Sequence, residues 1–270
     1  MKILCLHGHN QNGQIFQGQL SETIKEIKKF EAGVSLDFAD APVRCASPLA
    51  NGKAVYKFFD APVVAEIAEA REWLASKLDA DGPYDGVISF AEGATLVSSY
   101  LLYHQWYCQE QSPPFRFAVF IGGGILLEVL KDLGILVPRV AEHAVEEAER
   151  RRDGNLGPSP SQVSLARQAL FNSDDCFGLN LNKIPLELKV KIPTAHVWGE
   201  NDPCFPSSIH LVSLCDPYIR KIYVHSNAHE VPQETEDNYQ LGQLVLWCIQ
   251  RASWPGRLQA QWEGSQKNCT

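Results

Sequence analysis

The sequence predicts an α/β protein with a mostly parallel sheet and helices on both faces of that sheet. Short apolar runs of strand type alternate along the chain with longer segments of helical spacing. A chain of 270 residues can bury one large core of this kind, and its composition does not require two independent domains. We therefore expect a single domain over residues 1–270 that carries one insertion.

The strand pattern occurs in six segments: residues 2–6, 34–39, 86–90, 116–121, 192–198 and 219–224. Helices are expected between them. One follows Pro62, a favoured helix starter, and repeats apolar residues at a spacing of about 3.6. Another covers residues 234–252, with acidic residues at its start and Arg251 near its end, as the helix dipole prefers.

Between residues 125 and 190 the alternation of strand and helix fails. The segment contains a charged helical stretch, "AEHAVEEAERRRD", followed by the loop signal "GNLGPSPS". An insertion between two strands of a parallel sheet can lie over their carboxyl ends, where open α/β sheets bind ligands. We expect a helical cap or lid over 125–190; the alternative is a peripheral helical excursion.

Composition and charge restrict the class of partner. Hydrophobic residues make up 45% of the chain and charged residues 21%, which are ordinary globular values. A net charge of −8 argues against nucleic acid and anionic membranes, because phosphates are bound by basic surfaces. The apolar runs are shorter than a membrane span, and "KILCLHG" after Met1 has the pattern of a strand and not of a signal peptide. We expect a cytoplasmic protein.

Metal and cofactor motifs are not expected. The eight cysteines are scattered, without a Cys-x-x-Cys pair or a histidine spacing suited to zinc, so we expect reduced thiols. "FIGGG" at 120–124 lacks the spacing of a dinucleotide-binding loop. "HEVPQ" at 229–233 begins like a zinc motif but has no second histidine, and its proline opposes a helix.

A strand, a sharp turn and a helix start are predicted over "VISFAEGAT", residues 87–95. This is the frame that presents a catalytic serine in the pattern G-x-S-x-G, where small residues allow the chain to approach itself closely. Here the five positions read Ser89, Phe90, Ala91, Glu92 and Gly93. The central residue, Ala91, has no hydroxyl.

An acid and a histidine follow in the order found in α/β-hydrolases, nucleophile then acid then histidine. "PTAHVWGENDPCFP" places Asp202 in a turn after a strand, and "IYVHSNAHEVP" places His229 in the loop after the next strand. In such a set the acid orients the imidazole, which accepts the nucleophile's proton. Taken singly, Asp202 could equally be a turn-forming residue and His229 an ordinary loop histidine. His225 is the alternative base.

Two backbone amides complete this scheme. "CLHGHNQNG" leaves the first strand, so the amide of His9 is expected to face the same point as the amide of Glu92. A pair of such amides forms an oxyanion hole, which stabilises a tetrahedral intermediate. The Glu92 side chain has no part in this scheme and is expected to be solvated.

With these motifs in place, the sequence resembles the family of serine hydrolases (FSH), which includes proteins of the ovarian-cancer-associated protein 2 type and trans-acting thioesterases of fungal polyketide pathways. The resemblance covers nearly the whole chain, through "LCLHGHNQNGQIF", "DGVISFAEGA", "FRFAVFIGGG", "IPTAHVWGENDP" and "AHEVP" in family order. It implies a three-layer α/β-hydrolase fold, with Ala91 at the nucleophile position, Asp202 as the acid and His229 as the base.

The resemblance also implies an activity and partners. The substrate would be a small-molecule acyl ester or thioester, and the reaction would release a polyketide from the acyl carrier protein of a polyketide synthase. Four aromatic residues would suit a hydrophobic acyl chain and are our candidate substrate contacts: Phe90, Phe171, Phe177 and Phe205.

The chain departs from the family pattern at Ser89, where glycine is usual, and at Ala91, where serine is usual. Removing a triad serine typically lowers turnover by about a million-fold, so no acyl-enzyme is expected here. One explanation is an engineered serine-to-alanine change, which we favour because Asp202 and His229 are undisturbed. The other is a natural alanine, in a pseudo-hydrolase that binds a small hydrophobic ligand or in a cyclase or isomerase that uses His229.

Overall fold

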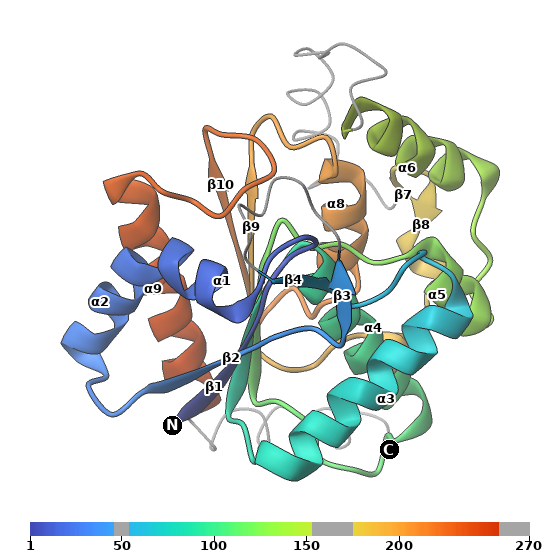
Figure 1. Ribbon diagram of the computed structural model, residues 1–270. Helices are drawn as coiled ribbons and strands as arrows, with labels where there is room; N and C mark the ends of the chain where they lie inside the picture. Colours follow the sequence, from blue (N-terminus) through green and yellow to red (C-terminus); the bar gives the residue numbers. More distant parts are fainter. Residues whose placement is uncertain (46–53, 153–174, 254–270) are drawn as a thin grey trace.

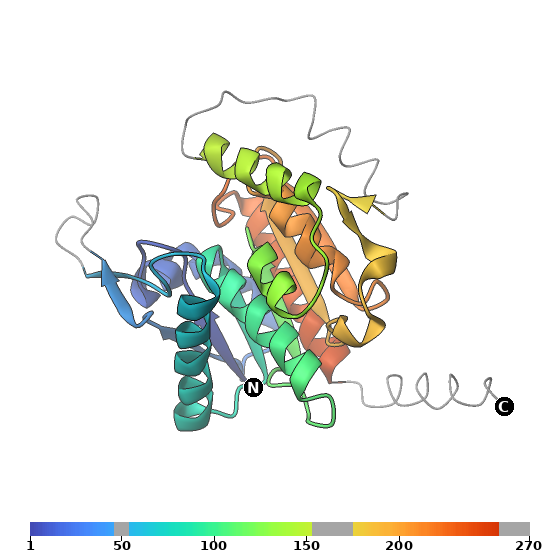
Figure 2. The same ribbon diagram turned by 90° about the vertical axis from the view of Figure 1, so that its right-hand side faces the viewer.

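The computed structural model describes residues 1–45, 54–152 and 175–253, which form three layers around one parallel sheet (Figures 1 and 2). The six strands of the sheet lie in the order β10-β9-β6-β5-β1-β2 and all pair in parallel. Their bounds are β1 (Lys2–Leu6), β2 (Ser35–Ala39), β5 (Gly86–Phe90), β6 (Phe117–Ile121), β9 (Thr194–Gly199) and β10 (Arg220–His225). The predicted strands and the predicted parallel sheet are confirmed, with ends shifted by at most two residues.

Helices cover both faces of the sheet, as Figure 1 shows. One face carries α1 (Gly13–Gln19), α2 (Ser21–Phe30) and α9 (Thr235–Ala252), and the other carries α3 (Val64–Asp81), α4 (Glu92–Tyr107) and α8 (Phe205–Ser213). Successive side chains of a strand point to opposite faces. In β1, Leu4 and Leu6 therefore join the core beneath α3 and α4, whereas Ile3 and Cys5 join the core beneath α2 and α9.

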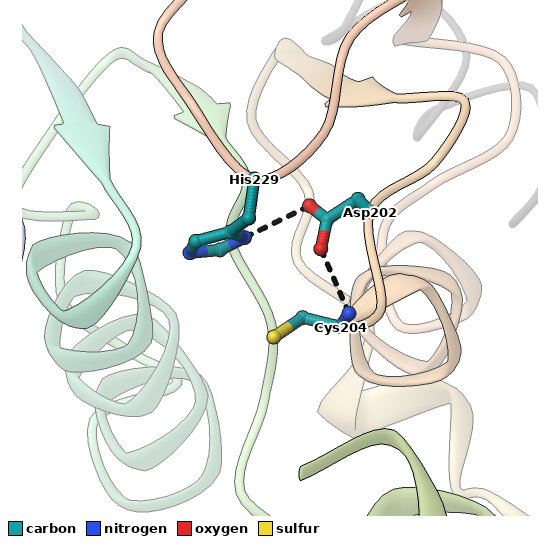
Figure 3. A group of neighbouring side chains, drawn as sticks. All are labelled: Asp202, Cys204 and His229. Carbon is teal, nitrogen blue, oxygen red and sulfur yellow. Dashed lines mark hydrogen bonds and ion pairs between the residues drawn. The ribbon is translucent and has the colours of Figure 1, made fainter. Parts of the chain in front are cut away.

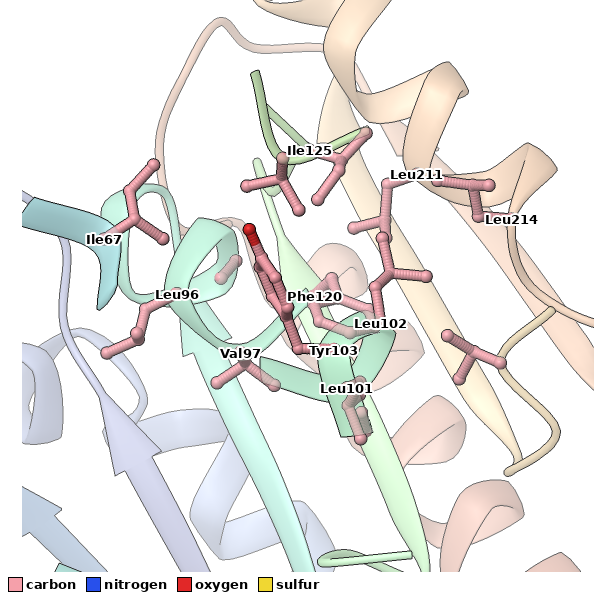
Figure 4. Close-up of a cluster of buried hydrophobic side chains, with 14 of the residues drawn as sticks. Ile67, Leu96, Val97, Leu101, Leu102, Tyr103, Phe120, Ile125, Leu211 and Leu214 are labelled. Carbon is pink, nitrogen blue, oxygen red and sulfur yellow. The ribbon is translucent and has the colours of Figure 1, made fainter. Parts of the chain in front are cut away.

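The core on the α3 and α4 face anchors α4 firmly. Leu96, Val97 and Leu102 of that helix have no exposed surface and pack with Phe120 of β6 and Leu211 of α8 (Figure 4). Full burial of one such side chain contributes about 1.5–3 kcal/mol to folding. The position of α4 is thereby set by packing along its length, and so is the place of its first residue, Glu92.

Two short strands that the sequence analysis missed lie beside the end of β1. β3 (Val43–Cys45) and β4 (Val55–Lys57) form an antiparallel pair, and Tyr56 of β4 also bridges to Gln11. Three-residue strands carry too little periodicity to be distinguished from loops in the sequence. The pair brings the backbone of Phe58 next to the loop that leaves β1, since the ring of Phe58 packs 5.3 Å from that of His7.

Besides the predicted charged helix, the described residues of the inserted segment between β6 and β9 contain five short elements. In order, the segment has α5 (Leu127–Asp132), α6 (Arg139–Arg152), β7 (Asp175–Cys176), β8 (Leu179–Asn180) and the 3-10 helices η2 (Leu181–Lys183) and η3 (Leu186–Leu188). β7 and β8 pair as an antiparallel hairpin, and α6 contacts α8. The predicted loop at 154–161 lies outside the described residues. Among the described residues, no helix is both long and apolar enough to cross a membrane.

The turn between β5 and α4 is a single residue long. β5 ends at Phe90, α4 begins at Glu92, and Ala91 between them has φ 47° and ψ −110°. This left-handed conformation costs a residue with a Cβ about 1–3 kcal/mol. Gly93 is required because a Cβ at this position would lie 2.6 Å from the carbonyl oxygen of His7. The strand, sharp turn and helix predicted for this stretch are confirmed.

The strain at Ala91 predicts an unusual effect of glycine. We expect Ala91→Gly to raise the free energy of unfolding by about 1 kcal/mol, because glycine adopts a positive φ without a steric penalty. Urea denaturation followed by circular dichroism measures the change. Ala65→Gly, at an exposed site within α3, is the matched control and should lower the same quantity by about 1 kcal/mol. A loss of stability in Ala91→Gly equal to that in the control would show that the turn is not strained.

Candidate active site

The acid and the histidine predicted from the sequence lie side by side after β9 and β10. Nδ1 of His229 is 2.9 Å from Oδ2 of Asp202, as Figure 3 shows. The Asp202 side chain has no exposed surface, and its Oδ1 accepts a hydrogen bond of 2.7 Å from the amide of Cys204. A carboxylate only accepts hydrogen bonds, so Nδ1 of His229 carries the proton and Nε2 is the free basic nitrogen.

Backbone contacts bring the two loops together. The amide of Asn201 donates to the carbonyl oxygen of Asn227 at 3.0 Å. The amide of Glu200 donates to the carbonyl oxygen of His225 at 2.6 Å. A Cβ at Gly199 would lie 2.1 Å from the carbonyl oxygen of Ala228, so only glycine permits this approach. The acid and the base are thus positioned by main chain and not only by their own hydrogen bond.

Ala91 and His229 line the same cavity, which has a volume of about 710 Å³. The ring of Phe90, also in the cavity wall, packs against the ring of His229 with centroids 5.5 Å apart. Gly122 has a positive φ of 52°, and a Cβ there would lie 3.0 Å from Cε1 of His229. The glycine after β6 therefore leaves the space in which the imidazole lies.

His9 and Glu92, the residues predicted to supply oxyanion amides, also line this cavity. The loop of His9 is close to Ala91, because a Cβ on Gly8 would lie 3.3 Å from the Cβ of Ala91. Among the described residues, no carbonyl or side chain accepts a hydrogen bond from the amide of His9 or of Glu92. The amide of Gly8, in contrast, donates to Oε1 of Gln11 at 3.3 Å.

The side chain of Glu92 is not solvated as the sequence analysis expected. Only 10% of this side chain is exposed. Burial raises the pKa of the Glu92 carboxyl, whereas hydrogen bonds from the Phe58 amide and the His9 ring oppose that rise. This carboxylate, mostly shielded from solvent and hydrogen-bonded to two donors, is part of the cavity wall.

The aromatic candidates divide three ways. Phe90 lies in the cavity wall. Phe177 and Phe205 do not: they pack edge to face at 5.7 Å in a separate buried cluster that also contains Trp198. Our interpretation of these two as substrate contacts is wrong for the cavity described here, because the β7–β8 hairpin turns Phe177 toward α8. Phe171 lies outside the described residues.

The three serines nearest to position 91 in the chain, Ser89, Ser98 and Ser99, are not placed to replace a serine at that position. Ser89 is fully buried and donates to the carbonyl oxygen of Val119 at 3.3 Å. Ser98 and Ser99 are also fully buried, and both donate to the carbonyl oxygen of Thr95 on their own helix. His225, the alternative base, is 2% exposed at the end of β10 and is not part of the cavity wall.

Cys204 is a neighbour of the acid and histidine that the sequence analysis missed. Its thiol lies within 4.8 Å of both an Asp202 carboxylate oxygen and a His229 ring nitrogen. Burial, and then the Asp202 carboxylate, raise the pKa of this thiol to about 12, so it is protonated and a poor nucleophile at neutral pH. Because both Asp202 oxygens already accept hydrogen bonds, we interpret the group as an acid–imidazole pair and not as a metal centre.

Other parts of the cavity wall come from segments far apart in the sequence. Phe59, Asp60 and Pro62 precede α3, and Val145, Ala148 and Glu149 belong to α6. These residues have no motif, and no local signal distinguishes them from ordinary helix or loop residues. The charged helix of the inserted segment nevertheless does face the cavity.

Comparison with known proteins gives the same family along the chain. The family model described as "Serine hydrolase (FSH1)" matches residues 1–241. Esterase alnB of Emericella nidulans is 25% identical, with 93% of this chain and 97% of the esterase aligned. Hydrolase FUB4 of Fusarium oxysporum f. sp. lycopersici is 23% identical, with 92% of this chain and 98% of the hydrolase aligned.

Solved structures show the same fold at lower sequence identity. Mouse alpha/beta hydrolase domain-containing protein 10 superposes with a TM-score of 0.52 at 15% identity, covering 93% of this chain and 90% of that protein. Arabidopsis thaliana SOBER1 gives a TM-score of 0.51 at 16% identity, covering 93% and 98%. With its parallel sheet, its helical layers and the family match over most of its length, the chain belongs to the serine hydrolase (FSH1) family and has the α/β-hydrolase fold.

Proposed function

We propose that the parent form of this protein hydrolyses an ester or thioester through an acyl-serine intermediate at position 91, and that the chain with Ala91 binds such a substrate without turning it over. One observation carries the proposal. A hydrogen-bonded acid–histidine pair and a strained one-residue turn open onto the same cavity, although the turn carries no hydroxyl. The strained backbone at Ala91 and the buried carboxylate of Asp202 are both costly in free energy. A serine nucleophile at position 91 would depend on both.

The reaction follows from these positions. With serine at 91, Nε2 of His229 takes the hydroxyl proton while the oxygen attacks the carbonyl carbon of the substrate. The amides of His9 and Glu92 donate to the resulting oxyanion. His229 then protonates the leaving alcohol or thiol, and the acyl-serine remains. Water, deprotonated by the same nitrogen, releases the acid and restores the serine.

The substrate class is a hydrophobic acyl chain with a small polar reacting group. Phe59, Phe90, Leu126 and Val145 supply apolar walls to the cavity, and its volume of about 710 Å³ suits a drug-sized ligand. The family resemblance favours a polyketide thioester carried by an acyl carrier protein as the first substrate to test. We treat residues 125–190 as the cap of this cavity, since α6 contributes to its wall.

Restoring the hydroxyl tests the proposal directly. We expect Ala91→Ser to react with a fluorophosphonate probe and to hydrolyse p-nitrophenyl butyrate or an acyl thioester at least about 10⁴-fold faster than the Ala91 chain. Mass spectrometry of the labelled protein and a continuous absorbance assay measure the two effects. Ala148→Ser, which places a hydroxyl elsewhere in the cavity wall, is the control and should not react.

The other outcomes identify the alternatives. A serine form that neither labels nor turns over would refute the acyl-serine mechanism. Tight binding of a hydrophobic ester to both forms in that case would indicate a pseudo-hydrolase. Conversion of a ligand by the Ala91 chain itself, lost in His229→Ala, would indicate a cyclase or isomerase.

The acid and the base are tested in the Ala91→Ser protein. We expect Asp202→Asn to lower kcat by about 10⁴-fold and His229→Ala by about 10⁶-fold, because the first loses the orientation of the imidazole and the second the base itself. Steady-state kinetics on the same ester measures both. His225→Gln tests the alternative base. If that variant loses as much as His229→Ala while remaining folded, the assignment of His229 fails.

A further inference from the structure

The carboxylate of Glu92 joins three segments around the position of the nucleophile. It belongs to the first residue of α4, directly after the turn at Ala91. Its Oε2 accepts a hydrogen bond of 2.7 Å from the amide of Phe58, and its Oε1 lies 3.1 Å from Nδ1 of His9. The first partner follows β4 and the second follows β1, so one side chain connects the elbow to both neighbouring loops.

A solvated glutamate at a helix start would need no such partners. A carboxylate in the first turn is favoured by the helix dipole even when it faces water. Here only 10% of the side chain is exposed, and loss of water around a charge is costly unless hydrogen bonds compensate for it. The side chain has exchanged water for two donors on loops that flank the cavity.

The loop after β1 is held at several points, but His9 itself is held by Glu92. The ring of His7 accepts from the Ala41 amide at 3.0 Å and donates to the carbonyl oxygen of Gly8 at 2.7 Å. These contacts fix the residues before His9. For His9, whose side chain is 51% exposed, the hydrogen bond found among the described residues is the one with Glu92. Without it, the peptide that presents the His9 amide would have one restraint fewer on the cavity side.

We propose that the Glu92 carboxylate is a positioning residue that holds the loop of His9 and the backbone of Phe58 so that the His9 and Glu92 amides converge on one oxyanion. The inference rests on the proposed function, since it assigns the carboxylate a role in that reaction. Oxyanion contacts are strongest in the transition state, so their loss lowers kcat and changes KM little.

Two substitutions at Glu92 distinguish the effect of its hydrogen bonds from the effect of its negative charge. In Ala91→Ser protein, we expect Glu92→Ala to lower kcat by about 10- to 100-fold, with KM changed by less than about threefold, because a loop displaced by a fraction of an ångström weakens the oxyanion contact. Glu92→Gln should recover most of that loss. Its amide oxygen can accept from Phe58, and its amino group can donate to the alternative tautomer of His9.

A double-mutant cycle and a matched control sharpen the test. His9→Ala keeps the His9 amide but removes the ring, so its effect on kcat should not add to that of Glu92→Ala. Asp237 is the control: it is also a buried carboxylate in the first turn of a helix, it accepts a hydrogen bond of 2.5 Å from Tyr223, and it lies outside the cavity wall. Asp237→Ala should lower stability and leave kcat within about twofold.

A second measurement does not depend on activity. Hydrogen–deuterium exchange of the Ala91 chain should show faster exchange of the Phe58 amide and of the loop after β1 in Glu92→Ala, and protection close to the original in Glu92→Gln. Equal exchange in all three proteins would overturn the inference, because the carboxylate would then hold nothing in place.

The outcomes distinguish this inference from the proposed function. If Ala91→Ser is inactive with Glu92 intact, the proposed function fails, and the positioning role of the Glu92 carboxylate in catalysis fails with it. If Ala91→Ser is active and Glu92→Ala leaves kcat within about twofold, or raises KM and leaves kcat, the positioning role alone is wrong. A loss of kcat that Glu92→Gln restores, together with the exchange result, supports it.

Discussion

The one-residue turn at Ala91 is the constraint on which the other parts of the site depend. Its left-handed backbone reverses the chain between β5 and α4, so that Ala91 and Glu92 both line the cavity. The conformation is unfavourable for alanine and persists because α4 is held along its length by buried side chains. Gly93 permits the helix to begin against the carbonyl oxygens of Leu6 and His7.

The parallel arrangement of the strands places the remaining groups at the same edge of the sheet. The carboxyl ends of β1, β5, β6, β9 and β10 are neighbours in a parallel sheet, and each contributes one loop to the site. Glycines at 122 and 199 let these loops approach without side-chain clashes. The acid–histidine pair is therefore a consequence of strand order and of close backbone packing, to which its own hydrogen bond adds orientation.

The missing hydroxyl stands out against this intact surrounding. Asp202 is fully buried, and both of its oxygens accept hydrogen bonds, which is how a carboxylate can be kept in a protein interior. Such an arrangement orients an imidazole toward a proton donor. Alanine at 91 supplies no such donor, although the cavity, the imidazole of His229 and the buried acid surround it.

The sequence by itself determined the sheet, the elbow and the order of the site residues. Strands in the interior of a parallel sheet are continuous apolar runs, and the small residues at 91, 93 and 94 mark a turn whose sterics are local. Asp202 and His229 followed from their positions after strands. These features depend on short-range constraints, so a single stretch of sequence carries each of them.

Only the tertiary structure decided which distant side chains share an environment. Phe177 and Phe205 resemble acyl-chain contacts in the sequence, but Phe177, between β7 and β8, packs against Phe205 of α8. Cys204 and the carboxylate of Glu92 acquired their neighbours through loop packing, since Phe58 lies 34 positions from Glu92 in the chain. Burial and pKa are properties of the folded surroundings, and residue identity alone does not contain them.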